Sequence, residues 1–337
     1  MNSQNSEVVM VTGASAGVGR ATALAFAKRG AHLGLIARGL PGLESLRKEI
    51  EALGARAVVL QCDVADPEQV EASAKKLEDA FGPINIWVNN AMTTIFAPLK
   101  KIEPAEYKRA TEVTYLGTVY GTMAAVKRML SRDRGTIVQV GSALAYRSIP
   151  LQSPYCGAKH AILGFTASLR SELLHDGSNV HITMVHLPAM NTPQFEWCRT
   201  RLPRHPQPVP PIFEPEVAAE AIYWAAHHRR REVRVGASTV KAILGNKVMP
   251  STLDHYLGNV GYEAQQTHDP VLPDRPDNLF EPVDTDYGMH GSFGSQSANF
   301  SLQTWSTLHR GTLTAVAAGA AVLAWAVGRN RKPRRKH

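Results

Sequence analysis

Residues Thr12-Gly13-Ala14-Ser15-Ala16-Gly17-Val18-Gly19 lie between a short apolar run, 8–11, and a segment rich in alanine and leucine with helical spacing. Three glycines between a strand and a helix allow positive φ and a close approach of the backbone to a pyrophosphate, while the helix N-terminus offers free N–H groups. We therefore predict that Gly13, Ser15, Gly17, Val18 and Gly19 bind a dinucleotide. A tight turn without a ligand is the alternative.

Beyond this turn, short β-branched runs alternate with longer amphipathic segments, which is typical of βαβ units. The predicted strands are 8–11, 32–37, 57–61, 84–88, 136–140, 180–185 and 232–235, and the main predicted helices after the first are 43–53, 67–81, 155–174 and 215–226. The strands are apolar enough to be buried on both faces. We predict an α/β fold: a Rossmann-type doubly wound parallel sheet with helices on both faces.

The chain of 337 residues, 44% of them hydrophobic, suits one large core and a tail. We assign residues 1–265 to a catalytic domain. Residues 266–311, rich in proline and then in glycine and serine, are expected to be an irregular, flexible extension. The chain has three cysteines, an odd number, and none has the spacing of metal ligands, so we expect neither a disulfide framework nor a zinc site. This favours a reducing, cytoplasmic location.

The C-terminal segment 312–337 is predicted to be an apolar helix with a basic tail. Residues 312–328 carry no charge and would span about 26 Å as a helix, slightly less than a bilayer core. Membrane association through 312–337 is the leading interpretation, and docking on the protein or on a partner subunit is the alternative. The net charge of +8 owes much to the last nine residues, so we expect no specific nucleic acid.

The end of the second predicted strand indicates which dinucleotide would bind. NAD-binding folds usually have an acidic residue there, whereas this chain has Ala37 and then Arg38. A cation at this place suits the 2′-phosphate of NADP(H), with NAD(H) the less favoured cofactor, and Arg20 could add to it. Asp63, after the third strand, could accept a hydrogen bond from the adenine amine. Alternatively, Arg38 is only a solvated loop residue and Asp63 a turn cap.

A second group of polar residues suggests proton chemistry. Tyr155 and Lys159 lie four residues apart in a predicted helix, so both face the same side, and a nearby ammonium would stabilise the phenolate of a tyrosine that moves a proton. Ser142 follows the strand 136–140, and Asn90 follows the strand 84–88, which places both at the carboxyl edge of the sheet where ligands bind.

Taken together, in this order and at this spacing, these motifs resemble the short-chain dehydrogenase/reductase family over roughly residues 5 to 240. The resemblance implies that Tyr155 is the general acid/base, that Lys159 lowers its pKa and holds the nicotinamide ribose, and that Ser142 positions the reacting oxygen. It places Thr192 against the nicotinamide carboxamide. It also implies a homo-oligomer, because family members are commonly dimers or tetramers.

The chain departs from the family pattern at three places. Met92 stands where glycine is usual after Asn-Asn-Ala, Thr114 occupies the position of the family's fourth catalytic residue, an asparagine, and Leu187-Pro188 lies in register with Pro-Gly. A threonine hydroxyl could replace the asparagine in holding a water of the proton relay.

The expected activity is NADP(H)-dependent interconversion of a small-molecule alcohol and its carbonyl. The segment 191–213, where a lid over the substrate is expected, contains Phe195, Trp197 and several prolines, so we predict an apolar substrate. The alternative is a catalytically weak protein of the same fold that senses cofactor or binds at a membrane.

Overall fold

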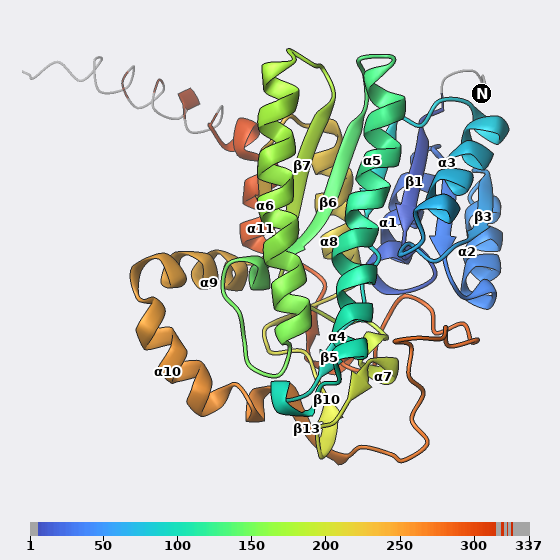
Figure 1. The fold of residues 1–337 in the computed structure, drawn as a ribbon. Coiled ribbons are helices and arrows are strands. Elements are labelled where there is room, and N and C mark those ends of the chain that lie inside the picture. The colour runs from blue at the N-terminus through green and yellow to red at the C-terminus, as the bar shows by residue number, and fades with distance from the viewer. Residues whose placement is uncertain (1–5, 315–317, 320–321, 323–324, 326–337) are drawn as a thin grey trace, which may run out of the picture.

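A computed structural model describes residues 6–314, 318, 319, 322 and 325 of the chain. Its centre is a seven-stranded sheet in the order β12-β7-β6-β4-β1-β2-β3 (Figure 1). Every neighbouring pair in this sheet is parallel. The strands are β1 Val8–Thr12, β2 His32–Ala37, β3 Ala57–Gln61, β4 Ile86–Asn89, β6 Thr136–Ser142, β7 His181–Leu187 and β12 Glu232–Arg234. The predicted parallel sheet is confirmed.

Helices cover both faces of this sheet, as predicted. One core cluster joins the sheet to α1 (Gly17–Ala27), α2 (Leu40–Ala52) and α8 (Pro215–His227). The second joins it to α3 (Pro67–Phe81), α5 (Gly117–Leu130) and α6 (Ser153–His175), which lie in front of the sheet in Figure 1. Every strand of the sheet except β12 contributes side chains to both clusters. The alternating apolar residues of the strands therefore form two cores.

Smaller elements gather beyond the carboxyl ends of the strands. They are β5 Ile95–Phe96, α4 Pro104–Thr111, a π-helical turn at Glu112–Leu116, a 3-10 turn at Ala143–Ala145, β8 Ala189–Met190, α7 Gln194–Trp197, β9 Arg199–Thr200, β10 Arg204–Pro206, β11 Ile212–Phe213, α9 Ala237–Val248 and α10 Pro250–Val260. β5 pairs with β9, and β11 pairs with β8. The carboxyl edge is therefore covered by segments distant in sequence.

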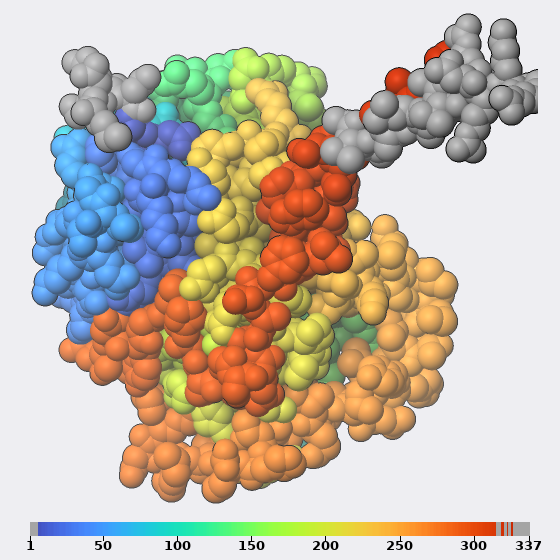
Figure 2. All heavy atoms as spheres, turned by 180° about the vertical axis from the view of Figure 1, so that it is seen from behind, coloured from blue at the N-terminus to red at the C-terminus, as the bar shows by residue number. Residues whose placement is uncertain are grey.

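The C-terminal extension is largely irregular, as predicted, but it also contributes to small sheets. β13 (Gln266–Pro270) pairs antiparallel with β10, and β14 (Ser297–Ala298) pairs with β11. Figure 2 shows the extension crossing the lower part of the molecule and rising beside α8, where α11 (Leu302–Leu308) lies.

The proposed membrane segment lies mostly beyond the described part of the chain. Residues 315–317, 320, 321, 323, 324 and all of 326–337 fall outside it, so the prediction for 312–337 stays a prediction. Among the residues that the structure does describe, no helix combines the length and the apolar character needed to cross a membrane.

Candidate active site

A cavity of about 520 Å³ lies at the carboxyl edge of the sheet. It brings together most of the site residues predicted from the sequence: Gly13, Ser15, Gly17, Val18, Arg38, Asp63, Asn90, Ser142, Tyr155, Lys159 and Thr192. Gly19 does not line the cavity, since it lies one step further into α1. Residues more than 170 positions apart thus share one site because parallel strands end at the same edge.

The glycine turn has no room for side chains. Gly13 and Gly17 have positive φ, +66° and +55°, and a Cβ on Gly19 would lie 2.0 Å from the carbonyl oxygen of Gly13. Asn90 holds this turn, because its Nδ2 donates to the carbonyl oxygens of Thr12 (3.0 Å) and Gly13 (3.2 Å). Its side chain therefore shapes the turn.

The N-terminus of α1 keeps hydrogen-bonding capacity next to this turn. Ala16, the residue before the helix, makes no side-chain cap. The N–H of Gly17 donates to the carbonyl oxygen of Gly288 at 3.3 Å, but no side chain caps the helix. The remaining N–H groups of the first turn and the positive end of the helix dipole are the combination that binds phosphate. The turn and the helix end together form a cradle with the shape and charge for a pyrophosphate.

Ser142, Tyr155 and Lys159 converge on the opposite side of the cavity. Ser142 ends β6, and α6 carries the other two residues on one face, as the four-residue spacing predicted. The Nζ of Lys159 lies 5.5 Å from the centre of the Tyr155 ring and donates to the carbonyl oxygen of Val140 at 2.6 Å. The hydroxyl of Ser142 is near enough to the phenol of Tyr155 to act on its pKa.

Burial changes the ionisation of these groups. It raises the pKa of Tyr155 above its ordinary value, and the hydroxyl of Ser142 opposes this rise. It lowers the pKa of Lys159, which is only 3% exposed, to about 8. Both shifts follow from the same cause, since a low-dielectric surrounding disfavours the charged form of either group.

The comparison with known proteins identifies the family. The profile described as short chain dehydrogenase matches residues 7–201 of the chain. The chain belongs to the short-chain dehydrogenase family. The predicted resemblance is therefore confirmed.

Relatives of this short-chain dehydrogenase are oxidoreductases. An "Uncharacterized oxidoreductase YxnA" of Bacillus subtilis (strain 168) is 30% identical over 325 residues, which is 96% of this chain and 90% of that protein. A "3-dehydrosphinganine reductase" of Danio rerio is 34% identical over 196 residues, covering 57% of this chain and 58% of the relative. The match to the Bacillus protein reaches far into the C-terminal extension.

A solved structure supports nicotinamide cofactor chemistry for this fold. A metagenomic short-chain oxidoreductase in complex with NADP superposes with a TM-score of 0.58 at 26% sequence identity, covering 69% of this chain and 98% of that one.

The two arginines expected near the cofactor have partners in this short-chain dehydrogenase. Arg20 is buried and pairs with Glu49 and with Asp286 (2.6 Å), so the structure does not support its suggested contribution to phosphate binding. Arg38 lines the cavity and is not a merely solvated loop residue, since it donates to backbone carbonyls of the extension. Burial, and then the charge of Arg109, lower the pKa of Arg38.

Asp63 is held within the protein. One carboxylate oxygen accepts from the N–H of Ala65 at 3.0 Å, and the other pairs with Arg109. Asp63 therefore does cap a turn, as the alternative interpretation of the sequence suggested. Because a carboxylate has further lone pairs and Asp63 lines the cavity, a contact with adenine stays a prediction.

Thr114 does not have the free hydroxyl that a water relay would need. It is 0% exposed, donates to the carbonyl oxygen of Thr93 and accepts from its N–H, both at 3.0 Å. The single hydroxyl proton is therefore used. The suggested substitution for the family's asparagine has no geometric support. Met92, the other departure in this region, lines the cavity.

The loop after β7 and the expected lid also reach the cavity. Thr192 lies against the glycine turn, where a Cβ on Gly17 would come within 3.0 Å of its methyl group. Phe195 and Trp197, on α7, line the cavity, as do Pro188 and Pro208. The altered Leu187-Pro188 sequence therefore does not remove Thr192 from the site.

Sequence reasoning missed the part of the cavity wall built by the extension. Asn278, Pro282, Val283, Thr285 and Tyr287 line the cavity, and the ring of Tyr287 lies edge-on to that of Trp197 with centroids 4.6 Å apart. No local pattern marks these residues, because their partners lie about 90 to 270 positions earlier in the chain. The density of prolines was the only signal, and it indicated irregular chain.

Proposed function

We propose that this chain is an NADP(H)-dependent oxidoreductase that interconverts an alcohol and its carbonyl, with Tyr155 as general acid/base. The observation that carries the proposal is the convergence of Ser142, Tyr155 and Lys159 on a cavity whose other end is the glycine turn. A dinucleotide held in this turn would extend toward the three side chains.

The residues present fit a dinucleotide. Gly13 and Gly19 let the turn close tightly where a Cβ would collide with the backbone, and no side chain caps the N-terminus of α1. Arg38 supplies the cation for a 2′-phosphate, which supports NADP(H) over NAD(H). When bound, the reduced nicotinamide supplies the hydride.

In the reducing direction, Tyr155 donates its proton to the substrate oxygen as that oxygen gains negative charge. Ser142 orients the same oxygen through its hydroxyl. Lys159 stabilises the phenolate that remains, because a cation near a phenolate favours the charged form. In the oxidising direction the same phenolate accepts the proton.

Most of the substrate end of the cavity is apolar. Its lining includes Phe96, Leu144, Ile149, Met190, Phe195, Leu257 and Val260. These side chains support an apolar alcohol or carbonyl compound as substrate. Because Ser142, Tyr155 and Lys159 line one cavity together, the alternative of a binding protein without turnover is not favoured.

Tyr155→Phe tests the proposal. We expect at least a hundredfold loss of NADPH consumption over a panel of apolar ketones and aldehydes, because the proton donor is removed. NADPH binding, followed by its fluorescence, should persist. The matched control is Tyr146→Phe, which removes a phenol bonded to Glu232 at 2.7 Å outside the cavity and should keep turnover. Near-normal turnover of Tyr155→Phe would reject the proton-transfer role.

A further inference from the structure

The segment 275–290 of the extension, here called the strap, is attached to the substrate lid at its first end. The guanidinium of Arg275 donates to the carbonyl oxygen of Cys198 at 2.5 Å and to that of Phe195. Asp277 pairs with Arg199, and the N–H of Asn278 donates to the carbonyl oxygen of Trp197 at 3.0 Å. The strap therefore begins as part of the lid.

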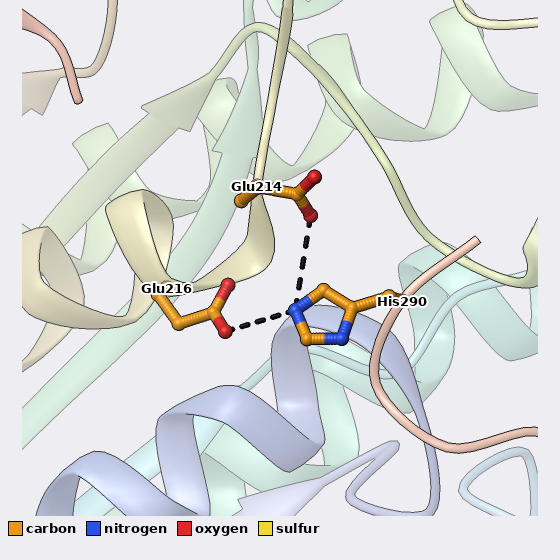
Figure 3. A group of neighbouring side chains, drawn as sticks. All are labelled: Glu214, Glu216 and His290. Carbon is orange, nitrogen blue, oxygen red and sulfur yellow. Dashed lines mark hydrogen bonds and ion pairs between the residues drawn. The ribbon is translucent and has the colours of Figure 1, made fainter. Parts of the chain in front are cut away.

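Its second end is attached to α1 and α8. Asp286 pairs with Arg20, and the carbonyl oxygen of Gly288 accepts from the N–H of Gly17 at 3.3 Å. His290 lies 2.9 Å from Glu216 and 3.8 Å from Glu214 at the start of α8 (Figure 3).

The three side chains in Figure 3 are close enough to bind a cation, but their contacts favour a structural role. Both oxygens of Glu214 accept from Asn191 at 3.1 Å, and one also accepts from Ser297. Glu214, Glu216 and His290 therefore attach the strap to α8.

The middle of the strap is anchored by Leu279. Its side chain is 0% exposed and belongs to a cluster with Ile95, Ala97 and Ala110. Its N–H donates to Asp277 at 2.8 Å, and its carbonyl oxygen accepts from Arg109 at 3.2 Å. A buried side chain together with backbone bonds on both sides fixes residues 278–280 in position.

Those three residues hold the guanidinium of Arg38. One terminal nitrogen donates to the carbonyl oxygen of Phe280 at 2.7 Å and, at 3.5 Å, to that of Leu279, and the other donates to the carbonyl oxygen of Asn278. Among the contacts of the described residues, none uses the Nε–H of Arg38. An arginine offers five N–H donors, so part of the guanidinium edge that includes Nε stays available.

We propose that the strap is a specificity element of the cofactor site: its carbonyls 278–280 position Arg38 to bind the 2′-phosphate of NADP(H). An arginine on a flexible stem loses rotamer freedom when it binds a phosphate, and a guanidinium that is already held loses less. The extension thus contributes to cofactor choice without contacting the phosphate itself. This inference rests on the NADP(H) preference given under Proposed function.

Leu279→Ala releases the anchor without altering Arg38. We expect NADPH binding to weaken about tenfold, roughly the worth of one charge-assisted hydrogen bond, and NADH binding to stay within about twofold. Dissociation constants for both cofactors are measured by fluorescence titration. The matched control is Leu272→Ala, the same substitution at a 70% exposed leucine earlier in the extension, which should change neither constant more than about twofold.

Asp277→Ala is a second variant that leaves the buried cluster intact. It removes the carboxylate that holds Leu279 and Arg199, and it also removes a negative charge that interacts with Arg38. Charge alone predicts tighter NADPH binding, whereas the positioning role predicts weaker binding. The sign of the change therefore separates the two explanations, and thermal unfolding without cofactor checks that each variant is folded.

Arg38→Leu separates a failure of the inference from a failure of the proposed function. If it leaves the preference for NADPH over NADH unchanged, Arg38 is not the selector and both proposals fall at this point. If Arg38→Leu removes the preference but Leu279→Ala and Asp277→Ala do not, the positioning role is wrong and the proposed function stands. Equal weakening of both cofactors by Leu279→Ala would make the strap a general cover, which also overturns the inference.

Discussion

Replacing Lys159 by methionine removes a buried positive charge but keeps a side chain of similar length. Burial lowers the pKa of Lys159 to about 8 from its ordinary value of 10.5. Because a tenfold change in an ionisation equilibrium is worth about 1.4 kcal/mol, the charged lysine costs the folded protein about 3 kcal/mol. The bond from its Nζ to Val140 contributes about 1 kcal/mol in the opposite direction.

The pH dependence follows from these two contributions. Below about pH 8 the folded protein carries the full cost, so Lys159→Met should raise the free energy of unfolding by about 2 kcal/mol at pH 7. Between about 8 and 10.5 the unfolded chain binds a proton that the folded protein has released, so the stability of the wild type rises with pH relative to the variant. Near pH 10.5 only the lost hydrogen bond is left, and the variant should be about 1 kcal/mol less stable.

The assay is urea unfolding of both proteins without cofactor at several pH values. Subtracting the two curves cancels all groups that titrate in the same way in both proteins. Lys48→Met, the same change at an exposed lysine of α2, should stay within about 0.5 kcal/mol of the wild type. A variant that is less stable than the wild type at pH 7, or a difference that does not change between pH 7 and 10, would refute the reasoning. Turnover should be lost in the variant at every pH, since the phenolate of Tyr155 loses its cation.

Two further predictions concern the glycine turn and the lid. Gly19→Ala places a Cβ 2.0 Å from the carbonyl oxygen of Gly13, so we expect the affinity for NADPH to fall at least tenfold. The control is Gly164→Ala, a substitution in open space on α6, which should bind NADPH normally. Equal affinities of the two variants would show that the turn adapts to the added methyl group. Glu106 of α4 is 3% exposed and pairs with Arg199 and Arg201 of the lid. Burial raises the pKa of Glu106, but the hydrogen bonds from Arg201, from the backbone N–H of Glu103 and from Arg199 outweigh burial and lower the pKa to about 2. The stability that the ionised Glu106 contributes is present above about pH 4.5 and is lost as the pH falls toward 2. Glu106→Gln should therefore lower the free energy of unfolding by about 1–3 kcal/mol at pH 7 and make it depend less on pH in the acid range. Chemical denaturation at several acid pH values measures this, and an unchanged pH dependence would contradict the prediction.

The amino-acid sequence by itself determined the sheet, its helical layers and the two ends of the site. Local chemistry is sufficient there: β-branched runs predict buried strands, glycines mark the turn at residues 13–19, and the spacing of Tyr155 and Lys159 places them on one helix face. Ser142 and Asn90 could be assigned to the same edge because parallel strands end on the same side of a sheet.

Only the tertiary structure decided which polar groups are free and which are already paired. From the sequence, Arg38 was the expected cation for the phosphate and Arg20 a possible second one, yet Arg20 is neutralised by Glu49 and Asp286 whereas Arg38 lines the cavity. The hydroxyl of Thr114 is taken up by Thr93. The strap was predicted only as irregular chain, because its bonds to Arg38 join residues about 240 positions apart and use backbone carbonyls, which every residue has and no sequence pattern records.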